Sequence, residues 1–569
     1  MNDNRNMLLA IVLSAIVLLG WGLLSEKFFP TAGPQTQQVE NGKVKPAPAP
    51  GPVVETPQAI RDRSVVLAEA PRVKIETPRL KGSINLKGAR FDDLVLVSAQ
   101  ETLDKNSEPV RLLSPAGAKG SYFAQFGWTG QGVAAPDANS VWSASAPVLA
   151  PGRPVTLSWR NSTGQRFELI VSVDDGYLFT VKQRVANLGT GAVGVRSYGL
   201  VSRAEKSTDV DGWTMHVGPM SYLNGAADYE VNYSTLDDDK SGVTKDSRGG
   251  WLGFTDKYWL TAVIPAEGAP IEANLRKSDS GAYQAGYASQ GSVLIAPGQA
   301  VTGEAHFFAG AKDYDLLQRY EREGITALSK SIDWGWFEWF MIPIFRLLLW
   351  LFHTIGNFGL AIIALTIIVR LIMFPIADKQ FRSMAGMRKV QPKMKALQER
   401  FKDDKPRLQQ EMLKLYQEEK INPAAGCLPI LLQIPIFYAL YKVLLVSVEM
   451  RHQPFYLWIK DLSAPDPLTP VNLFGLLPFT PPGFLAIGIL PILLGITMWI
   501  QFKLNPQQPD PVQAQIFSIM PWVLMFAMAP FAAGLQLYWV TNNILSIGQQ
   551  AWLYKRYDMH LSDTHPIKT

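Results

Sequence analysis

One charged side chain lies in the middle of a long apolar stretch, where it could do chemistry that a lipid environment ordinarily forbids. Arg370 sits in LTIIVRLIMFP and is the only ionisable residue between His353 and Asp378. A lone arginine at the centre of a membrane helix costs about 2.5–3.5 kcal/mol or more. Water or polar partners must therefore surround it, unless its long side chain snorkels to the headgroups near Asp378, about 12 Å further along the helix.

Other apolar stretches carry single polar residues that could join Arg370. Thr366 precedes Arg370 by four residues, so both lie on one helix face. The remaining candidates are Gln433 with Phe437, Gln501, and Tyr538 with Asn542. If these side chains converge, they line a hydrated groove inside the bilayer; if they are scattered, each makes an interhelical hydrogen bond, which is the commoner case. Lys442 is a second charge near the outer end of its span, where we expect it to snorkel.

The sequence lacks the residue patterns of a catalytic or metal centre. It has no G-x-x-x-x-G-K-[ST] loop, and its six histidines do not pair at metal-ligand spacing. Gly189, Gly191 and Gly194 form a G-x-G-x-x-G, but the following VRSYGLVS alternates like a strand, so we expect a loop between two strands. The single cysteine, Cys427, excludes an intramolecular disulfide. We therefore expect a protein that is not an enzyme and that needs no cofactor or metal.

The N-terminal region predicts a membrane anchor followed by a tether. Hydrophobic residues make up 47% of the 569-residue chain and charged residues only 18%, against about 25% in soluble domains. Residues 7–24 form an uninterrupted apolar run just long enough to cross a bilayer. No small-residue cleavage site follows, which favours an uncleaved anchor (1–29) over a signal peptide. The Pro-rich stretch at 30–59 is typical of an extended linker.

Residues 60–330 predict an antiparallel β-sandwich outside the cytoplasm. Short segments of alternating polarity are separated by Gly, Pro, Asn and Asp turns. These segments are 72–76, 91–97, 155–159, 167–173 and 258–264. A helical tail over 314–328 leads into a Trp-rich stretch at 331–350, which we expect to be an interfacial amphipathic helix in the headgroup zone.

The second half of the chain predicts five more crossings. They are a second transmembrane helix at 351–376, a third at 423–448, and the last three within 485–554. The segment 377–422 holds 12 Lys or Arg against 7 Asp or Glu, whereas the loop 449–484 has a net charge of −1. The positive-inside rule then places 377–422, the N-terminus and the tail at 555–569 in the cytoplasm. The fold class is a polytopic α-helical membrane protein with six transmembrane helices and a five-helix core, plus the sandwich.

The basic segment 377–422 is expected to fold as a helical hairpin. Apolar residues recur at intervals of three, four and seven on both sides of a polar break. They are Met384, Met387, Met394, Leu397 and Phe401, then Leu408, Met412 and Leu415. Gly386, Pro392 and Pro406 should interrupt the helices. The basic face is either solvated surface or a docking surface for partners or anionic lipid.

Five segments together resemble the YidC-type membrane protein insertases of Gram-negative bacteria. They are LTIIVRLIMFP (365–375), QPKMKALQER (391–400), INPAAGCLPILLQIPIFYALY (421–441), PFYLWIKDLSAPDP (454–467) and GLQLYWVTNN (534–543). The resemblance implies an insertase and folding chaperone of the inner membrane that uses no nucleotide hydrolysis and acts alone or beside the Sec translocon. It also implies that the sandwich is periplasmic and mutarotase-like, a likeness of fold and not of activity.

The resemblance also assigns roles and partners. It implies a substrate groove lined by Arg370, Thr366, Gln433, Gln501 and Asn542, and a hydrophobic slide at Phe437 and Tyr538. The implied partners are nascent inner-membrane proteins, the Sec translocon with its accessory subunits, membrane lipid, and a ribosome or targeting receptor at the hairpin.

Two departures from the family and two alternatives remain. The segment 468–483 looks like an insertion, and the tail after Tyr554 has only three basic residues, fewer than a ribosome-binding tail needs.

A secondary transporter would also carry intramembrane charge, but it normally shows two related repeats of spans, which are missing here. A periplasmic sugar-sensing module on a membrane anchor is the second alternative, and a binding assay on residues 60–325 discriminates it.

Overall fold

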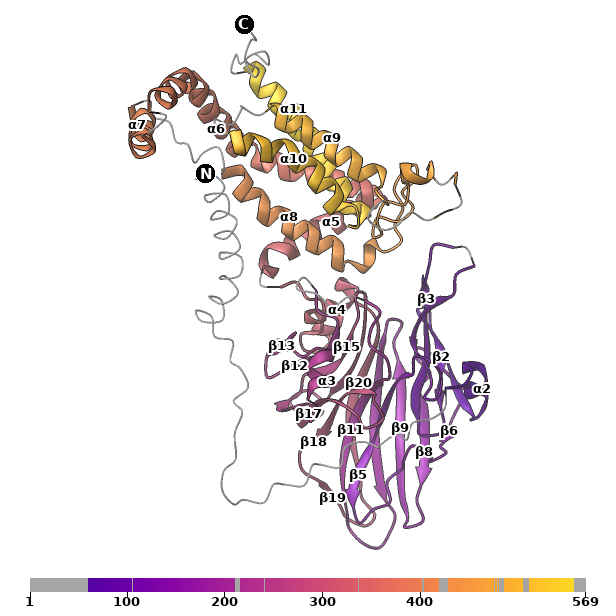
Figure 1. Cartoon of the computed structure of the whole chain (residues 1–569). Coiled ribbons are helices and arrows are strands. Elements are labelled where there is room, and N and C mark those ends of the chain that lie inside the picture. Colours follow the sequence, from indigo (N-terminus) through magenta and orange to yellow (C-terminus); the bar gives the residue numbers. More distant parts are fainter. Residues whose placement is uncertain are drawn as a thin grey trace. The chain divides into compact units, whose positions relative to one another are not determined.

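The computed structural model describes residues 60–556 (Figure 1). The exceptions within this range are residues 105, 210–214, 240, 336, 402–403, 419–427, 475, 478, 480–485 and 505–510. The predicted N-terminal anchor, the whole linker and most of the C-terminal tail lie outside the described residues, as does Cys427. The described part comprises a strand-rich region followed by a helical region.

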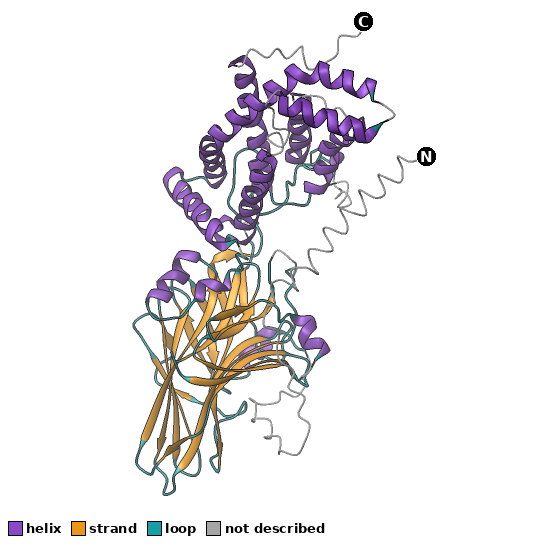
Figure 2. Cartoon of the chain, turned by 90° about the vertical axis from the view of Figure 1, so that its left-hand side faces the viewer, coloured by secondary structure: helices purple, strands orange, loops and turns teal. Residues whose placement is uncertain are grey.

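Two sheets make up the strand-rich region, and their strands appear in orange in Figure 2. Within the described residues, the first sheet has 11 strands in the order β14-β17-β18-β11-β5-β3-β2-β1-β7, with β19 beside β11 and β4 beside β3. The second has nine, in the order β13-β12-β15-β16-β20-β10-β9-β8-β6. Neighbouring strands run antiparallel, except that β1 pairs with β7 in parallel.

The strands of the first sheet are β1 (Arg72–Glu76), β2 (Leu80–Asn85), β3 (Arg90–Gln100), β4 (Pro109–Leu113), β5 (Tyr122–Gln131), β7 (Val148–Leu149), β11 (Val193–Arg203), β14 (Val243–Arg248), β17 (Pro270–Lys277), β18 (Tyr283–Ser289) and β19 (Val293–Ile295). Those of the second are β6 (Ser143–Ala144), β8 (Val155–Arg160), β9 (Gln165–Val173), β10 (Leu178–Asn187), β12 (Gly218–Leu223), β13 (Ala226–Asp228), β15 (Trp251–Thr255), β16 (Trp259–Pro265) and β20 (Ala300–Ala311).

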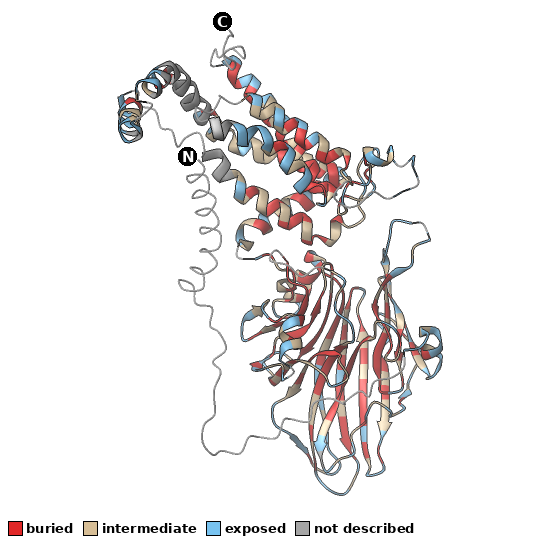
Figure 3. Ribbon diagram, viewed as in Figure 1, coloured by how far each residue is buried: buried red, intermediate tan, exposed pale blue. Residues whose placement is uncertain are grey.

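Alternating side chains join the two sheets, which confirms the predicted sandwich. Phe91 of β3 lies 5.4 Å, between ring centroids, from both Phe179 of β10 and Phe307 of β20, so rings from both sheets meet in one core. All three are buried. Figure 3 shows buried residues, in red, along many strands of the sandwich. Four of the five predicted segments lie within strands, and 72–76 matches β1 at both ends; the fifth, 258–264, begins one residue before β16. The glycine-rich stretch lies at the turn from β10 into β11, with no helix after it, as expected.

Short helices precede the long ones. They are α2 (Arg63–Ala68), α3 (Tyr233–Asp238), α4 (Tyr314–Arg322) and the 3-10 turn η1 (Leu328–Ser331). Asp313 caps α4, since its carboxylate accepts the Leu316 N–H at 3.1 Å. The Tyr320 hydroxyl of α4 accepts the Tyr177 N–H at 2.9 Å, which ties this helix to the sandwich.

The helical region consists of α5 (Glu338–Ile355), α6 (Phe358–Arg400), α7 (Lys405–Glu418), α8 (Leu428–Val446), α9 (Ile489–Leu504), α10 (Pro511–Met528) and α11 (Ala533–Arg556), with 3-10 turns η3 (Val448–Met450) and η4 (Pro470–Asn472). α11 packs against α6, α8 and α9, while α5 packs against α6 and α8. By length and composition, α5 and residues 358–379 of α6 could cross a membrane; 433–446, 489–504 and 515–528 are shorter apolar stretches. The total of six crossings stays a prediction.

The helix ends differ from the predicted boundary at 350/351. α5 begins later than expected and continues through residue 350 to Ile355. It ends there because Gly356 adopts a left-handed conformation, with φ of 77°, which glycine tolerates without steric cost. Asn357 then caps α6 by accepting the Leu360 N–H at 3.0 Å.

The basic segment contains two helices that meet through an apolar cluster. Val390 and Met394 of α6 are buried with Leu415 of α7, and Leu397, Met412 and Tyr416 pack around them. The expectation that Gly386 and Pro392 interrupt the helix was wrong, because α6 runs unbroken through both positions. The chain turns only after Arg400, and Pro406 lies in the first turn of α7, where its missing N–H costs nothing.

Candidate substrate groove

Arg370 is held by α11. Its Nε–H donates to Asn542 Oδ1 at 2.9 Å, and one of its terminal amino groups donates to the Asn542 carbonyl at 3.2 Å and to the Ser546 hydroxyl. Asn542 and Ser546 are buried. The guanidinium is therefore bound laterally, to the neighbouring helix, and the snorkelling alternative does not describe this arrangement. Among the described residues, its hydrogen-bond acceptors are all neutral oxygens.

The polar groups on α11 recur every four residues. Tyr538, Asn542 and Ser546 thus lie on one face of the helix, and all three are buried. The sequence reasoning named the first two and missed Ser546. The sequence could have indicated Ser546, because it follows Asn542 by four residues and so lies on the same helix face.

α8 approaches α11 one turn away from the arginine. The Gln433 side-chain amide donates to the Tyr538 hydroxyl at 2.8 Å. Phe437, one turn further along α8, packs its ring 4.6 Å from that of Trp539, measured between centroids. Two polar contacts, Gln433 with Tyr538 and Arg370 with Asn542, therefore join α8 and α6 to α11 at positions one helical turn apart.

Two other predicted groove residues lie outside that set. Thr366 is only 1% exposed and its hydroxyl donates to the Ile362 carbonyl of its own helix at 2.7 Å. Gln501 is half-buried on α9 and makes no hydrogen bond to a described residue. Polar contacts between α9 and α11 are instead made by Asn543, whose side chain donates to the Thr497 hydroxyl at 3.1 Å, and by Tyr554, whose hydroxyl donates to the Leu504 carbonyl.

The prediction for Lys442 was wrong. Its side chain is 2% exposed, and its ammonium lies 3.3 Å from Asp333 Oδ2. The same carboxylate accepts the backbone N–H of His216 at 3.1 Å and that of Gly335 at 2.9 Å. Snorkelling was expected because Lys442 lies near the outer end of its span; its carboxylate partner lies in the segment that precedes α5.

Aromatic packing reinforces this junction between the sandwich and the helices. The ring of Trp334 lies 5.9 Å from Tyr314 of α4 and 5.2 Å from Phe345 of α5, between centroids. Trp334 and Phe345 are almost fully buried. The junction around 314–345 is thus a packed part of the core.

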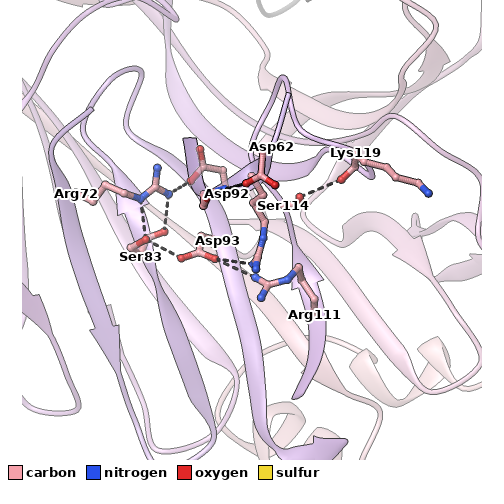
Figure 4. A network of polar contacts seen from close by, with 10 residues as sticks. Asp62, Arg72, Ser83, Asp92, Asp93, Arg111, Ser114 and Lys119 are labelled. Carbon is pink, nitrogen blue, oxygen red and sulfur yellow. Dashed lines mark hydrogen bonds and ion pairs between the residues drawn. The ribbon is translucent and has the colours of Figure 1, made fainter. Parts of the chain in front are cut away.

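The sandwich contains a polar network of its own, drawn in Figure 4, that spans β1 to β4. Arg72 donates to the Ser83 hydroxyl at 2.7 Å, Ser83 donates to Asp93 at 2.9 Å, and Arg111 donates to the other Asp93 oxygen at 3.1 Å. Arg72 also pairs with buried Asp92, whose pKa burial raises. Because both carboxylates have cationic partners, the network ties adjacent strands together and offers no free acid–base pair.

Comparisons with known proteins define the class of this chain. Residues 72–347 match the family described as YidC periplasmic domain, and residues 350–560 match the family described as 60Kd inner membrane protein. The chain is therefore an inner-membrane protein with a periplasmic β-sandwich. It is 46% identical over 559 residues, 98% of this chain and 96% of the relative, to the membrane protein insertase YidC of Zymomonas mobilis. The chain belongs to the YidC family of membrane protein insertases.

Solved structures are more distant. A structure described as an active YidC insertase with the first transmembrane domain resolved is 18% identical, covers 94% of this chain and 98% of its own, and gives a TM-score of 0.36. A galactose mutarotase related enzyme from Lactobacillus acidophilus is 12% identical over 42% of this chain and 97% of its own, with a TM-score of 0.30. At that score, the mutarotase-like fold of the sandwich stays a prediction.

The comparisons confirm the recognised family and the insertase function. They give no support to the secondary-transporter alternative, since the relatives are named as insertases.

Proposed function

We propose that this insertase moves the polar flank of a nascent inner-membrane protein across the bilayer along the face formed by α6, α8 and α11. In this proposal the positive charge of Arg370 attracts the flank. The supporting observation is the environment of the guanidinium, which contacts only neutral oxygens of α11 among the described residues. Its positive charge is thus not cancelled by a carboxylate. An acidic flank of a substrate is the chemistry that this charge attracts.

The energetics of such a device require no catalytic chemistry and no nucleotide. A substrate helix gains about 0.3–0.6 kcal/mol for each central Leu, Ile, Phe or Val, so insertion is downhill overall. The barrier is the transfer of the short polar flank. At 4 Å and an effective dielectric constant near 20, Arg370 would attract a carboxylate by about 4 kcal/mol. The membrane potential adds about 2.3 kcal/mol per charge per 100 mV and pulls the flank outward.

The other groove residues have separate parts in this proposal. Gln433, Asn542 and Gln501 supply hydrogen-bonding groups for the passing flank, while Phe437 and Tyr538 form the slide for the apolar segment. Thr366 lines the same helix face as Arg370, and its hydroxyl stays bonded to the Ile362 carbonyl. Because Asn542 and Ser546 hold the guanidinium, an incoming carboxylate exchanges with these neutral acceptors and does not have to break an ion pair.

The proposed topology follows from the charge of the loops. The N-terminus, the α6–α7 hairpin and the tail face the cytoplasm, and the chain crosses six times, with α5 at the membrane interface. The exposed Trp339 and Trp350 of α5 support an interfacial position. The hairpin receives a ribosome or targeting receptor, and the insertase acts alone or with the Sec translocon and its accessory subunits.

An insertion assay with two substrates tests the role of Arg370. Arg370→Lys should insert a substrate with an acidic translocated tail, and Arg370→Ala should insert it at least tenfold more slowly, because losing ~1.4 kcal/mol of attraction already costs that factor. A charge-free substrate should be much less sensitive. Arg346→Ala, which removes a half-exposed guanidinium on α5, serves as the matched control. Equal rates for Arg370→Lys and Arg370→Ala on the acidic substrate refute the proposal.

A further inference from the structure

An exposed apolar loop lies between α8 and α9. In the segment 468–479, six large apolar side chains are more than 40% exposed, and Leu476 reaches 81%. The others are Val471, Leu473, Phe474, Leu477 and Phe479. Figure 3 shows exposed stretches of this loop in pale blue, near the buried ends of the helices. So many large apolar side chains together on a surface mark a contact site.

The loop and the sequence that follows it, through most of α9, contain no charged residue. From Pro467 to Phe502 the sequence has no Asp, Glu, Lys or Arg over 36 residues. Interfaces with soluble proteins have a polar rim around an apolar centre. A stretch without charge that continues directly into an apolar helix is instead typical of chain in contact with lipid.

The backbone of the loop satisfies much of its own hydrogen bonding. Phe474 N–H donates to the Thr469 carbonyl at 3.0 Å, and Leu477 N–H donates to the Asn472 carbonyl at 3.1 Å. Further N–H groups, those of Leu468, Val471, Leu473, Leu476 and Phe479, donate within residues 466–477. A non-helical segment at the edge of a bilayer, where water is scarce, needs backbone hydrogen bonds within the segment itself.

Two residues of the loop adopt a strained backbone conformation, and both have side chains that face out from the protein. Leu473 and Phe474 have φ of 49° and 60°, in the left-handed region that residues with a Cβ disfavour. Both side chains are about half exposed, so burial in the protein does not compensate for the strain. Strain of this kind persists where a segment has a functional contact to make.

The base of the loop fixes its depth. Asp466 is 6% exposed, and its carboxylate accepts the Leu490 N–H in the first turn of α9 at 2.8 Å and the Trp458 indole N–H at 2.9 Å. The Ala533 N–H at the start of α11 donates to the Ala464 carbonyl at 2.7 Å. The loop therefore leaves the protein at the level where α9 and α11 begin, which in the proposed topology is the membrane interface.

We propose that residues 468–479 insert their apolar side chains into the leaflet at which α9 and α11 begin, the periplasmic leaflet in the proposed topology. The occupant of this surface is lipid. The loop thereby anchors the start of α9, through Asp466, at a fixed height beside the groove helix α11.

Depth-dependent quenching tests this proposal on the full chain. With Cys427 replaced by Ser, Leu476→Cys and Leu473→Cys are labelled with an environment-sensitive NBD probe and reconstituted in vesicles of phosphatidylethanolamine and phosphatidylglycerol. Lys460→Cys, an exposed polar position in the same interhelical loop, is the control. Because the two leucines are exposed, their replacement leaves the core intact.

The expected result is a blue-shifted emission at positions 473 and 476, loss of intensity with acyl-brominated lipid, and protection from aqueous iodide. The probe at position 460 should show the reverse. Iodide quenching at 473 and 476 equal to that at 460 would place the loop in water and overturn the proposal. Protection from both quenchers that increases with the protein-to-lipid ratio would identify a second copy as the occupant and would equally overturn it.

Discussion

Replacing Asp333 by Asn should loosen the junction between the sandwich and the helices more than any surface charge substitution. The Lys442 ammonium lies 3.3 Å from Asp333 Oδ2, and its side chain is 2% exposed. At that distance and an effective dielectric constant near 20, the attraction amounts to about 5 kcal/mol. Removing one partner of a buried pair costs about 3–5 kcal/mol, because the other charge stays buried without compensation.

The two single substitutions should differ in severity. Lys442→Met leaves the Asp333 carboxylate with the N–H groups of His216 and Gly335, which continue to stabilise its charge. Asp333→Asn removes the carboxylate that lies 3.3 Å from the almost fully buried ammonium. We therefore expect Asp333→Asn to be the more destabilising. The double variant should be less destabilising than the sum of the two, because it removes both charges and leaves neither one buried without its counter-charge.

Backbone hydrogen exchange across 333–346 measures the effect locally. A loss of about 3 kcal/mol in opening free energy corresponds to roughly 150-fold faster exchange in Asp333→Asn. The control is Glu304→Gln, which breaks a pair to Lys182 at a similar 3.5 Å but with side chains 46% and 52% exposed. It should change exchange near β20 by less than about 1 kcal/mol, and that change should shrink in high salt. Additivity of Asp333→Asn and Lys442→Met within about 0.5 kcal/mol would refute the coupling.

Three further predictions concern the elements around the groove. Deleting 384–416 should abolish insertion while the helical core stays folded; normal insertion by a correctly folded deletion would show that the basic face is only solvated surface. Deleting 60–300 should be tolerated in growth complementation and deleting through 345 should be lethal, because the second removes the Trp334–Phe345 packing; loss of growth with the shorter deletion at normal abundance would give the sandwich a direct part in insertion. Burial, with a contribution from Asp313, raises the pKa of the Glu449 carboxyl from an ordinary 4.5 to about 7, so the stability of the protein should fall as pH rises through that interval. Glu449→Gln should remove this pH dependence, measured as the difference between melting curves at pH 5 and pH 8. Replacing the exposed Glu323 by Gln is the control. An unchanged pH dependence in Glu449→Gln would contradict that assignment.

Local regularities were readable from the sequence alone. Alternation over 72–76 predicted β1 at both ends, because a half-exposed strand must alternate whatever its neighbours are. Arg370 was conspicuous for a similar reason, since the cost of a charge in an apolar run depends on the run itself. The four-residue spacing of Tyr538 and Asn542 placed them on one helix face without knowledge of any partner. The five quoted segments also identified the family, which the comparisons confirm.

Partners distant in the sequence were decided only by the tertiary structure. Lys442 pairs with Asp333, which precedes it by 109 residues and lies outside every apolar stretch, so no helical pattern could indicate it. Thr366 shares a face with Arg370, yet its hydroxyl bonds to Ile362 of its own helix, because packing buries it. α6 continues through Gly386 and Pro392, where propensity alone predicted breaks. Periodicity in the sequence indicates which face of a helix or strand is apolar. Only the packed fold determines which buried polar groups contact one another, and these contacts decide whether each group is paired, exposed or available to a substrate.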